Sequence, residues 1–246
     1  RGSVSPAEFI PIAEESNLIL SLSEWVFEEG MKQMAEWVER LGPSAPQTVS
    51  LNLSRKQFAQ ADLADRIATI ARRNALAPER IQLEVTEDFF ASDVNAAIAT
   101  MNAIKRHGMH LAIDDFGTGC SSFAALHQFP ADVLKIDRSM LTNIEKSKET
   151  AALVHSLSIL VRNLGMSIVA EGIETESQVI ILQELGCRFG QGFYFARPLT
   201  PAAFEEYALR HGSASGTVSG AAAFQDRWAE LAEQLHLELP AHLPSD

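Results

Sequence analysis

The sequence has few cysteines and no long apolar run. Only two of its 246 residues are cysteine, Cys120 and Cys187. Two are too few for a disulfide framework, so we expect free thiols in a reducing compartment. No apolar run approaches the roughly 20 residues that a membrane-spanning helix needs. The first residues, RGSVSPAEF, also lack the apolar core of a signal peptide. We therefore expect a cytoplasmic location and no direct membrane insertion of this segment.

Basic residues are scarce as well. Lysine and arginine number 20 against 32 acidic residues, which gives a formal net charge of -12. This charge repels nucleic acid, and no cluster of lysine and arginine creates a local basic patch. The composition therefore excludes DNA as a partner. An anionic small ligand can still bind where metal ions reverse the local charge.

Short apolar segments of strand length alternate with longer segments of helical period. Strands are predicted at 48–54, 80–87, 110–116, 132–138, 166–172 and 187–195. Helices are predicted at 6–17, 22–40, 61–76, 93–107, 148–164 and 175–185. This alternation predicts an α/β fold with a parallel sheet and right-handed crossovers.

Within the predicted strands, large apolar side chains occupy alternate positions. In the first strand, Val49, Leu51 and Leu53 share one face, whereas Asn52 lies on the other. A sheet covered on both faces would be apolar at nearly every position. The pattern therefore favours a TIM-like (β/α)8 barrel, with helices outside and polar groups at the carboxyl ends of the strands. Six strands are visible, and a closed barrel of this type needs eight.

The composition changes after Arg210. We expect residues 1–210 to form the barrel domain and the Gly/Ser-rich residues 211–220 to be a flexible spacer. Residues 221–246 are predicted to form a C-terminal helix and tail. An apolar stripe at helical spacing indicates the packing face of that helix. It consists of Phe224, Trp228, Leu231 and Leu235.

Polar residues recur where the predicted strands end. They are Asn52, Glu84, Asp114, Asp115, Lys135, Glu171 and Gln191. Four carboxylates and an amide oxygen in one small volume suit Mg²⁺ or Mn²⁺ rather than zinc. Four acids favour two ions, the usual arrangement for attack of an activated water on a phosphodiester. Glu87 and Glu174, each three residues beyond a strand-end acid, are expected to support loops.

Each position taken alone has a structural explanation. Asn52 could be a turn residue, and Asp114 and Asp115 could cap N–H groups of the glycine turn that follows. Lys135 could be only an ion-pair partner. The recurrence of this placement on successive strands favours the metal site. Lys135 would then stabilise charge on a phosphate or hold the attacking water.

Seven motifs together resemble those of a known family. The motifs are SPAEFIPIAEES, SLNLS, LEVTE, DDFGTG, LKIDRS, AEGIET and QGFYFARPL. From about Ser5 to Leu199, their order and approximate spacing resemble EAL-domain phosphodiesterases. The resemblance implies a TIM-like barrel with one antiparallel strand. It also implies hydrolysis of cyclic di-GMP to linear pGpG with Mg²⁺ or Mn²⁺.

The resemblance implies a role for each matching residue. The metal ligands would be Asn52, Glu84, Asp114, Asp115 and Glu171. The catalytic residues acting on the water would be Lys135, Glu171 and Gln191. Residues 116–129 resemble the family's mobile loop, which links the metal site to dimerisation, and Glu87 resembles its anchor. The residues expected to contact the substrate are Ser121, Arg197 and Pro198.

Two strands of the family have no counterpart in the sequence. One carries the Glu-Ala-Leu tripeptide, whose Glu is a metal ligand in the family and is usually followed by a substrate-binding arginine. We expect the intact protein to supply both strands, which would raise the number of barrel strands from six to eight. This fragment alone would then be inactive.

The resemblance predicts a cyclic di-GMP phosphodiesterase that forms a homodimer and carries further signalling domains. It would be cytoplasmic, or the cytoplasmic part of a larger membrane-anchored signalling protein. The alternative is a catalytically silent cyclic di-GMP receptor, and the residue at the missing Glu would decide between them. A purely structural or partner-binding barrel leaves the strand-end acids unexplained.

Overall fold

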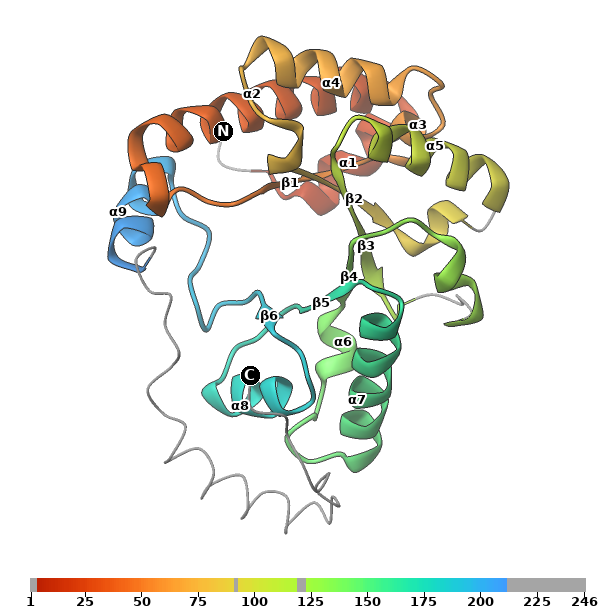
Figure 1. Ribbon diagram of the computed structural model, residues 1–246, viewed down its shortest axis with the longest axis vertical. Helices are drawn as coiled ribbons and strands as arrows, with labels where there is room; N and C mark the ends of the chain where they lie inside the picture. The colour runs from red at the N-terminus through yellow and green to blue at the C-terminus, as the bar shows by residue number, and fades with distance from the viewer. Residues whose placement is uncertain (1–3, 91–92, 119–122, 212–246) are drawn as a thin grey trace.

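The chain folds around one curved parallel sheet (Figure 1). Its structure is a computed structural model that describes residues 4–90, 93–118 and 123–211. The strands are β1 (Val49–Asn52), β2 (Ile81–Thr86), β3 (His110–Phe116), β4 (Val133–Ile136), β5 (Ser167–Ala170) and β6 (Phe189–Gly190). Their order in the sheet is their order in the chain, and every neighbouring pair is parallel. The result is a curled half-barrel with β1 and β6 at its edges.

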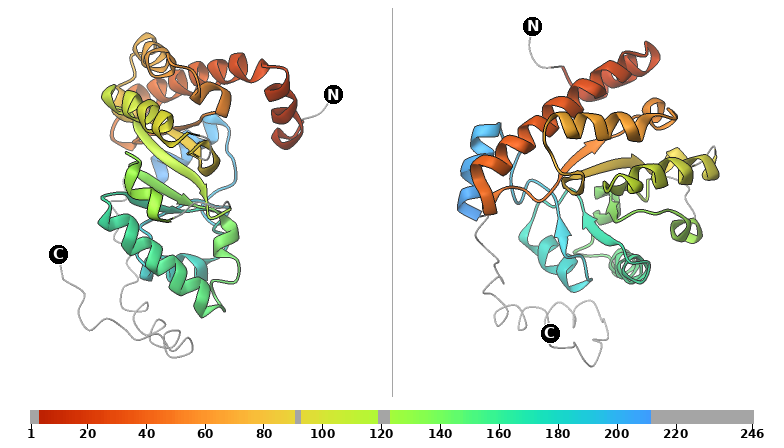
Figure 2. Two further views of the ribbon diagram at one scale, coloured as in Figure 1. Left: turned by 90° about the vertical axis from the view of Figure 1, so that its right-hand side faces the viewer. Right: turned by 45° about the horizontal axis from the view of Figure 1, so that its top comes forward.

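Helices between successive strands cover the outer side of the sheet (Figures 1 and 2). They are α3 (Arg55–Phe58), α4 (Leu63–Arg73), α5 (Val94–Arg106), α6 (Arg138–Leu141), α7 (Lys148–Asn163) and α8 (Glu176–Glu184). The remaining helices are α1 (Pro6–Glu15), α2 (Leu18–Leu41) and α9 (Pro201–His211). Short 3-10 turns are η1 (Gly42–Ser44), η2 (Pro78–Arg80), η3 (Glu87–Phe90) and η4 (Phe123–Gln128). None of the described helices is both long and apolar enough to cross a membrane.

Alternation along the strands decides which side chains enter the core. Ile81, Leu83 and Val85 of β2 are fully buried and belong to one apolar cluster with Ile67 of α4 and Met101 of α5. The intervening residues of β2 point to the opposite, concave side of the sheet. The apolar outer face that the sequence predicts is therefore present, and the polar positions are left for the inside of the half-barrel.

Capped helices begin shortly after two of the strands. Ser54 and Gln57 form a reciprocal capping box that starts α3 two residues after β1. Asp137 accepts a hydrogen bond from the Ser139 N–H directly after β4 and so starts α6. Such caps satisfy N–H groups that a helix start would otherwise leave unpaired. The chain therefore leaves the sheet at a defined residue after β1 and after β4.

All six described strands are parallel, as the alternation of strands and helices predicts. One strand differs from the expectation: β6 is two residues long, whereas a strand is predicted over 187–195, and a turn follows it. A Cβ atom at Gly192 would lie 2.1 Å from the carbonyl oxygen of Ile173, so the returning segment packs directly against backbone. Cys187 is a free, buried thiol as expected, whereas Cys120 lies outside the described residues.

Helix α9 is a second difference, because no helix is expected there from the sequence. Phe204 of α9 stacks on Trp37 of α2 with ring centroids 4.5 Å apart, and Glu205 pairs with Arg40 at 2.7 Å. Thr200 followed by Pro201 is a helix-start signal that could have revealed it. Helix α9 ends at His211, the first residue of the predicted spacer 211–220. The rest of that spacer and the predicted C-terminal helix lie outside the described residues.

Replacement of Leu83 by alanine tests the assignment of the core. We expect Leu83→Ala to lower the free energy of unfolding by about 2–5 kcal/mol, because it leaves a cavity in a fully buried site. Leu153→Ala on α7 is the matched control, since Leu153 is 44% exposed and should change the value by at most about 0.5 kcal/mol. Urea unfolding measures both. Equal losses would contradict the assignment.

Candidate functional site

A buried lysine joins three carboxylates at the carboxyl end of the sheet. The Lys135 Nζ of β4 lies 2.8 Å from Glu84 Oε2 of β2 and 2.9 Å from Asp114 Oδ1 of β3. It also lies 2.7 Å from Oε1 of Glu171, the residue after β5. The side chains of Lys135 and Glu84 are only 7% and 6% exposed. Four successive strands thus contribute to one ion cluster.

The cluster raises the pKa values of Lys135 and Glu171. Burial alone would lower the pKa of Lys135, but attraction to Glu84 and hydrogen bonds from the ammonium to Glu171, Glu84 and Asp114 raise it above 10.5. Burial raises the pKa of Glu171, and the nearby Asp114 and Glu84 raise it further, against the lowering effect of Lys135. With all four groups ionised, three negative charges face one positive charge. The site therefore retains an excess of negative charge that favours a cation.

Asp115 joins this site through a local distortion of β3. Consecutive strand residues normally point to opposite faces. The register of β3 against β4 shifts between Ile113 and Phe116, and Asp115 has a left-handed φ of 52°. Asp is one of the few residues besides glycine that enters this region readily. The Asp115 N–H donates to Asp114 Oδ1 at 3.0 Å, which fixes the Asp114 carboxylate against this bend. The Asp115 carboxylate lies within 4.8 Å of it.

Three carboxylates are close enough to share a metal ion. One oxygen from each of Asp114, Asp115 and Glu171 lies within 4.8 Å of the others. Hard carboxylate oxygens are the ligands that Mg²⁺ and Mn²⁺ favour. The three residues range from buried to exposed, so a cation can reach them from solvent. The donor set therefore fits a divalent cation of this class.

Glu84 and Asn52 occupy neighbouring strands at the edge of this group. Glu84 is engaged by Lys135, and Asn52 lies beside it in register but is exposed. Gln82 donates hydrogen bonds from Nε2 to Ser50 Oγ at 2.9 Å and to Glu84 Oε1 at 3.5 Å. These contacts were not predicted from the sequence. The position of Gln82 two residues before Glu84 on the same face is the signal that could have identified it.

The two predicted loop-supporting acids have different surroundings. Glu87 is buried, and its Oε2 accepts a hydrogen bond from the Gly117 N–H at 3.3 Å. Gly117 has φ 99°, and a Cβ there would lie 2.1 Å from Met140 Sδ, so the turn after β3 requires glycine. Glu174 is exposed, and it is its backbone N–H that donates to Gln178 Oε1 at 2.8 Å.

The remaining predicted site residues lie near the β6 edge. Gln191 follows β6, is exposed, and lines a pocket of about 430 Å³ together with Arg197. The Arg197 guanidinium lies 4.7 Å from the Phe193 ring centroid, and Pro198 is exposed beside it. Ser121 lies outside the described residues. The fold thus gathers Glu84, Asp114, Asp115, Lys135 and Glu171, while Asn52 and Gln191 lie on the two edge segments.

Comparison with known proteins gives one consistent family. Residues 1–198 match the family model of the EAL domain. MucR of Pseudomonas aeruginosa, a bifunctional diguanylate cyclase/cyclic di-GMP phosphodiesterase, is 39% identical over 198 residues. These residues are 80% of this chain and 29% of that protein. The chain spans between 23% and 35% of the length of the similar curated relatives.

Solved structures are similar as well. The phosphodiesterase of MucR in complex with c-di-GMP has a TM-score of 0.75 and 39% identity, with 81% of this chain and 80% of that one covered. BlrP1 of Klebsiella pneumoniae, in a complex with manganese and c-di-GMP, has a TM-score of 0.72 and 28% identity. This match covers 81% of this chain and 50% of that one. Both of these relatives thus bind c-di-GMP on a similar fold, and BlrP1 does so together with manganese.

Replacement of Lys135 by methionine tests the ion cluster. Without added metal, Lys135→Met should lower the free energy of unfolding by about 3–5 kcal/mol, because it leaves buried carboxylates without their counter-charge. Lys105→Met is the matched control. Lys105 pairs with Asp132 in a partly exposed ion pair, whose loss should cost at most about 1 kcal/mol.

Urea unfolding in EDTA measures both variants. A Lys135→Met protein as stable as the parent would show that the ammonium is not needed to hold the three carboxylates in place.

Proposed function

The chain belongs to the EAL domain family, and we propose that it forms the catalytic part of a cyclic di-GMP phosphodiesterase. The observation that carries the proposal is the group of three carboxylate oxygens within 4.8 Å of one another beside the buried ammonium of Lys135. This group combines cation ligands with a fixed positive charge, the two elements that hydrolysis of an anionic ester needs. The product would be linear pGpG.

Asp114, Asp115 and Glu171 would hold a divalent cation, Mg²⁺ or Mn²⁺. Asn52 and Glu84 on the neighbouring strands would complete the ligands for a pair of ions. When bound, the cations would lower the pKa of a water molecule and neutralise charge on the phosphate. The complex of BlrP1 with manganese and c-di-GMP supports the choice of metal.

The chain's own residues would bind and orient the reacting groups. The Lys135 ammonium would donate a hydrogen bond to a phosphate oxygen or to the attacking water. Glu171, which contacts Lys135 at 2.7 Å, would accept the proton of that water or act as a further ligand. Attack of the water oxygen on phosphorus breaks one P–O ester bond, and the leaving sugar oxygen takes up a proton. Gln191 would support the water from the β6 side.

Roles outside the acidic cluster follow from family membership. Glu87, through its contact with Gly117, would anchor the segment after β3, and Glu174 would support the loop after β5. Ser121, Arg197 and Pro198 would contact the substrate. Two further strands, one of them antiparallel, would close the barrel between β6 and β1 and supply another metal ligand. We further propose other signalling domains on the same polypeptide, since the matched relatives are much longer. The family resemblance also leads us to propose a homodimer.

Metal binding provides the first test. We expect saturable Mn²⁺ binding, followed by calorimetry, and at least a tenfold loss of affinity in Asp114→Asn because the amide removes a charged ligand. Asp65→Asn, which changes an exposed carboxylate paired with His107, should leave the affinity unchanged. Equal affinities in the parent and Asp114→Asn would remove Asp114 from the metal site.

Turnover provides the second test. The full-length protein that contains this chain should convert cyclic di-GMP to pGpG with Mn²⁺, and EDTA should abolish the reaction. Glu171→Gln should lower kcat by about 10²–10⁴-fold, the usual contribution of a positioned base, whereas Asp65→Asn should retain the parent's kcat.

Chromatography of the products measures turnover. Binding of cyclic di-GMP without any pGpG would overturn the enzymatic proposal and establish the alternative, a cyclic di-GMP receptor.

A further inference from the structure

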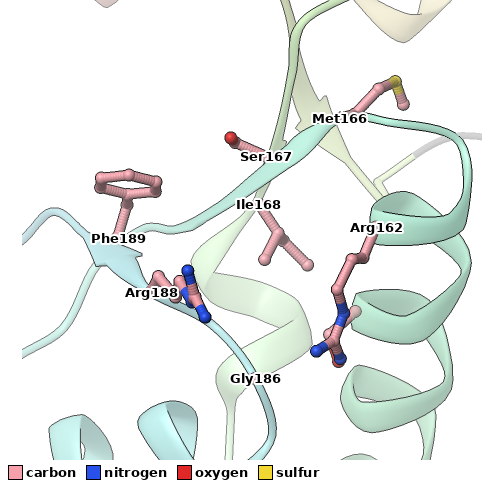
Figure 3. Close-up of a pocket in the computed structure, with 8 residues that line it drawn as sticks. Arg162, Met166, Ser167, Ile168, Gly186, Arg188 and Phe189 are labelled. Atoms are coloured by element: carbon pink, nitrogen blue, oxygen red, sulfur yellow. The ribbon is translucent and has the colours of Figure 1, made fainter. Parts of the chain in front are cut away.

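Two arginines face one small pocket at the amino end of the sheet. Arg162 extends from the last turn of α7, and Arg188 precedes β6 (Figure 3). The pocket has a volume of about 200 Å³ and is also lined by Ser167, the first residue of β5. Within residues 4–90, 93–118 and 123–211, neither guanidinium forms an ion pair. In a protein with a formal net charge of -12, this is a local concentration of uncompensated positive charge.

The backbone around Gly186 keeps this pocket open. Gly186 has φ 89°, and a Cβ there would lie 3.1 Å from Ser158 Oγ and 3.3 Å from Arg162 Nη2. The Ser158 hydroxyl is buried and donates to the carbonyl oxygens of His155 and Leu185, which fixes α7 against the turn before β6. Any side chain at 186 would therefore crowd the space in front of the Arg162 guanidinium.

A helix-dipole role explains only one of the two arginines. A cation in the last turn of a helix is stabilised by the carbonyl end of that helix, which accounts for Arg162. Arg188 lies outside any helix, so its approach to the same pocket needs another reason. Guanidinium forks that line the same pocket can bind the oxygens of a phosphate group in bidentate fashion.

We propose that Arg162 and Arg188 form a binding site for a phosphate group, either free or as a phosphate monoester. The two positive charges match the charge of a phosphate dianion. The pocket is smaller than the roughly 300–1,000 Å³ of pockets that enclose whole cofactors, so a phosphate group fits better than a complete nucleotide. Both arginines are exposed, and a ligand reaches them from solvent.

This site is independent of the proposed catalytic function. It lies at the start of β5, whereas Glu171 follows the end of that strand. Four strand residues span about 13 Å, which exceeds the screening length of about 8 Å at physiological salt. Binding of phosphate in the pocket should therefore persist in Asp114→Asn, which changes the acidic cluster.

Nuclear magnetic resonance of the metal-free chain in EDTA tests the site. Inorganic phosphate should cause saturable shifts of the backbone amides of Ser167, Gly186 and Arg188, whereas sodium chloride at equal ionic strength should not. Arg162→Gln and Arg188→Gln should each weaken binding at least tenfold, because each removes charge-assisted hydrogen bonds.

Two further variants control for charge and for geometry. Arg72→Gln removes an exposed arginine on α4 that donates to Thr69, and it should change the affinity less than twofold. Arg188→Lys keeps the charge without the planar fork, so its affinity should fall between those of the parent and Arg188→Gln.

Guanosine monophosphate distinguishes the two sources of the phosphate group. Affinity equal to that of inorganic phosphate identifies recognition of the phosphate alone, and tighter binding identifies a monoester. Shifts that are linear in phosphate, that chloride reproduces, or that persist in both glutamine variants would overturn the proposal.

Discussion

The contact of one buried ammonium with three carboxylates is the interaction on which the site depends. Lys135 reaches Glu84, Asp114 and Glu171 only because β2, β3, β4 and β5 are adjacent and parallel. Buried charges are costly unless they are paired, and the pairing restores the lost hydration energy only with good geometry. A slip of one residue in any of these strands would turn its charged side chain toward the apolar outer face. The ion cluster therefore penalises wrong registers of the sheet.

The same cluster has more acid than its single lysine can neutralise. Asp115 adds a further carboxylate through a left-handed backbone conformation and a register shift in β3. Such conformations usually cost on the order of 1–3 kcal/mol and persist where the surrounding structure determines them. Glu87 and the tight packing of Gly117 against Met140 hold the segment that follows. Local strain and excess negative charge thus coincide at the carboxyl end of β3.

Simple alternation predicted much of this arrangement. It correctly assigned Glu84, Asp114 and Lys135 to the inner face, because side-chain direction in a strand has a period of two. Alternation alone places Asp115 on the face opposite to Asp114, and the register shift between β3 and β4 changes this. Such a shift depends on how two strands pair, so alternation within one strand does not reveal it. The contact of Gln82 with Glu84 was missed for a similar reason, as it involves Ser50 of another strand. Helix α9 was missed although Thr200 and Pro201 mark its start.

The two ends of the sheet differ in charge, so they favour ligands of opposite charge. At the carboxyl end, the carboxylates outnumber Lys135, so this end carries an excess of negative charge. At the amino end, Arg162 and Arg188 are free of carboxylate partners among the described residues, so a phosphate group needs no metal there. Parallel strands produce this separation directly, because every strand begins at one rim and ends at the other. A short strand such as β5 is therefore long enough to separate an acidic end of the sheet from a basic one.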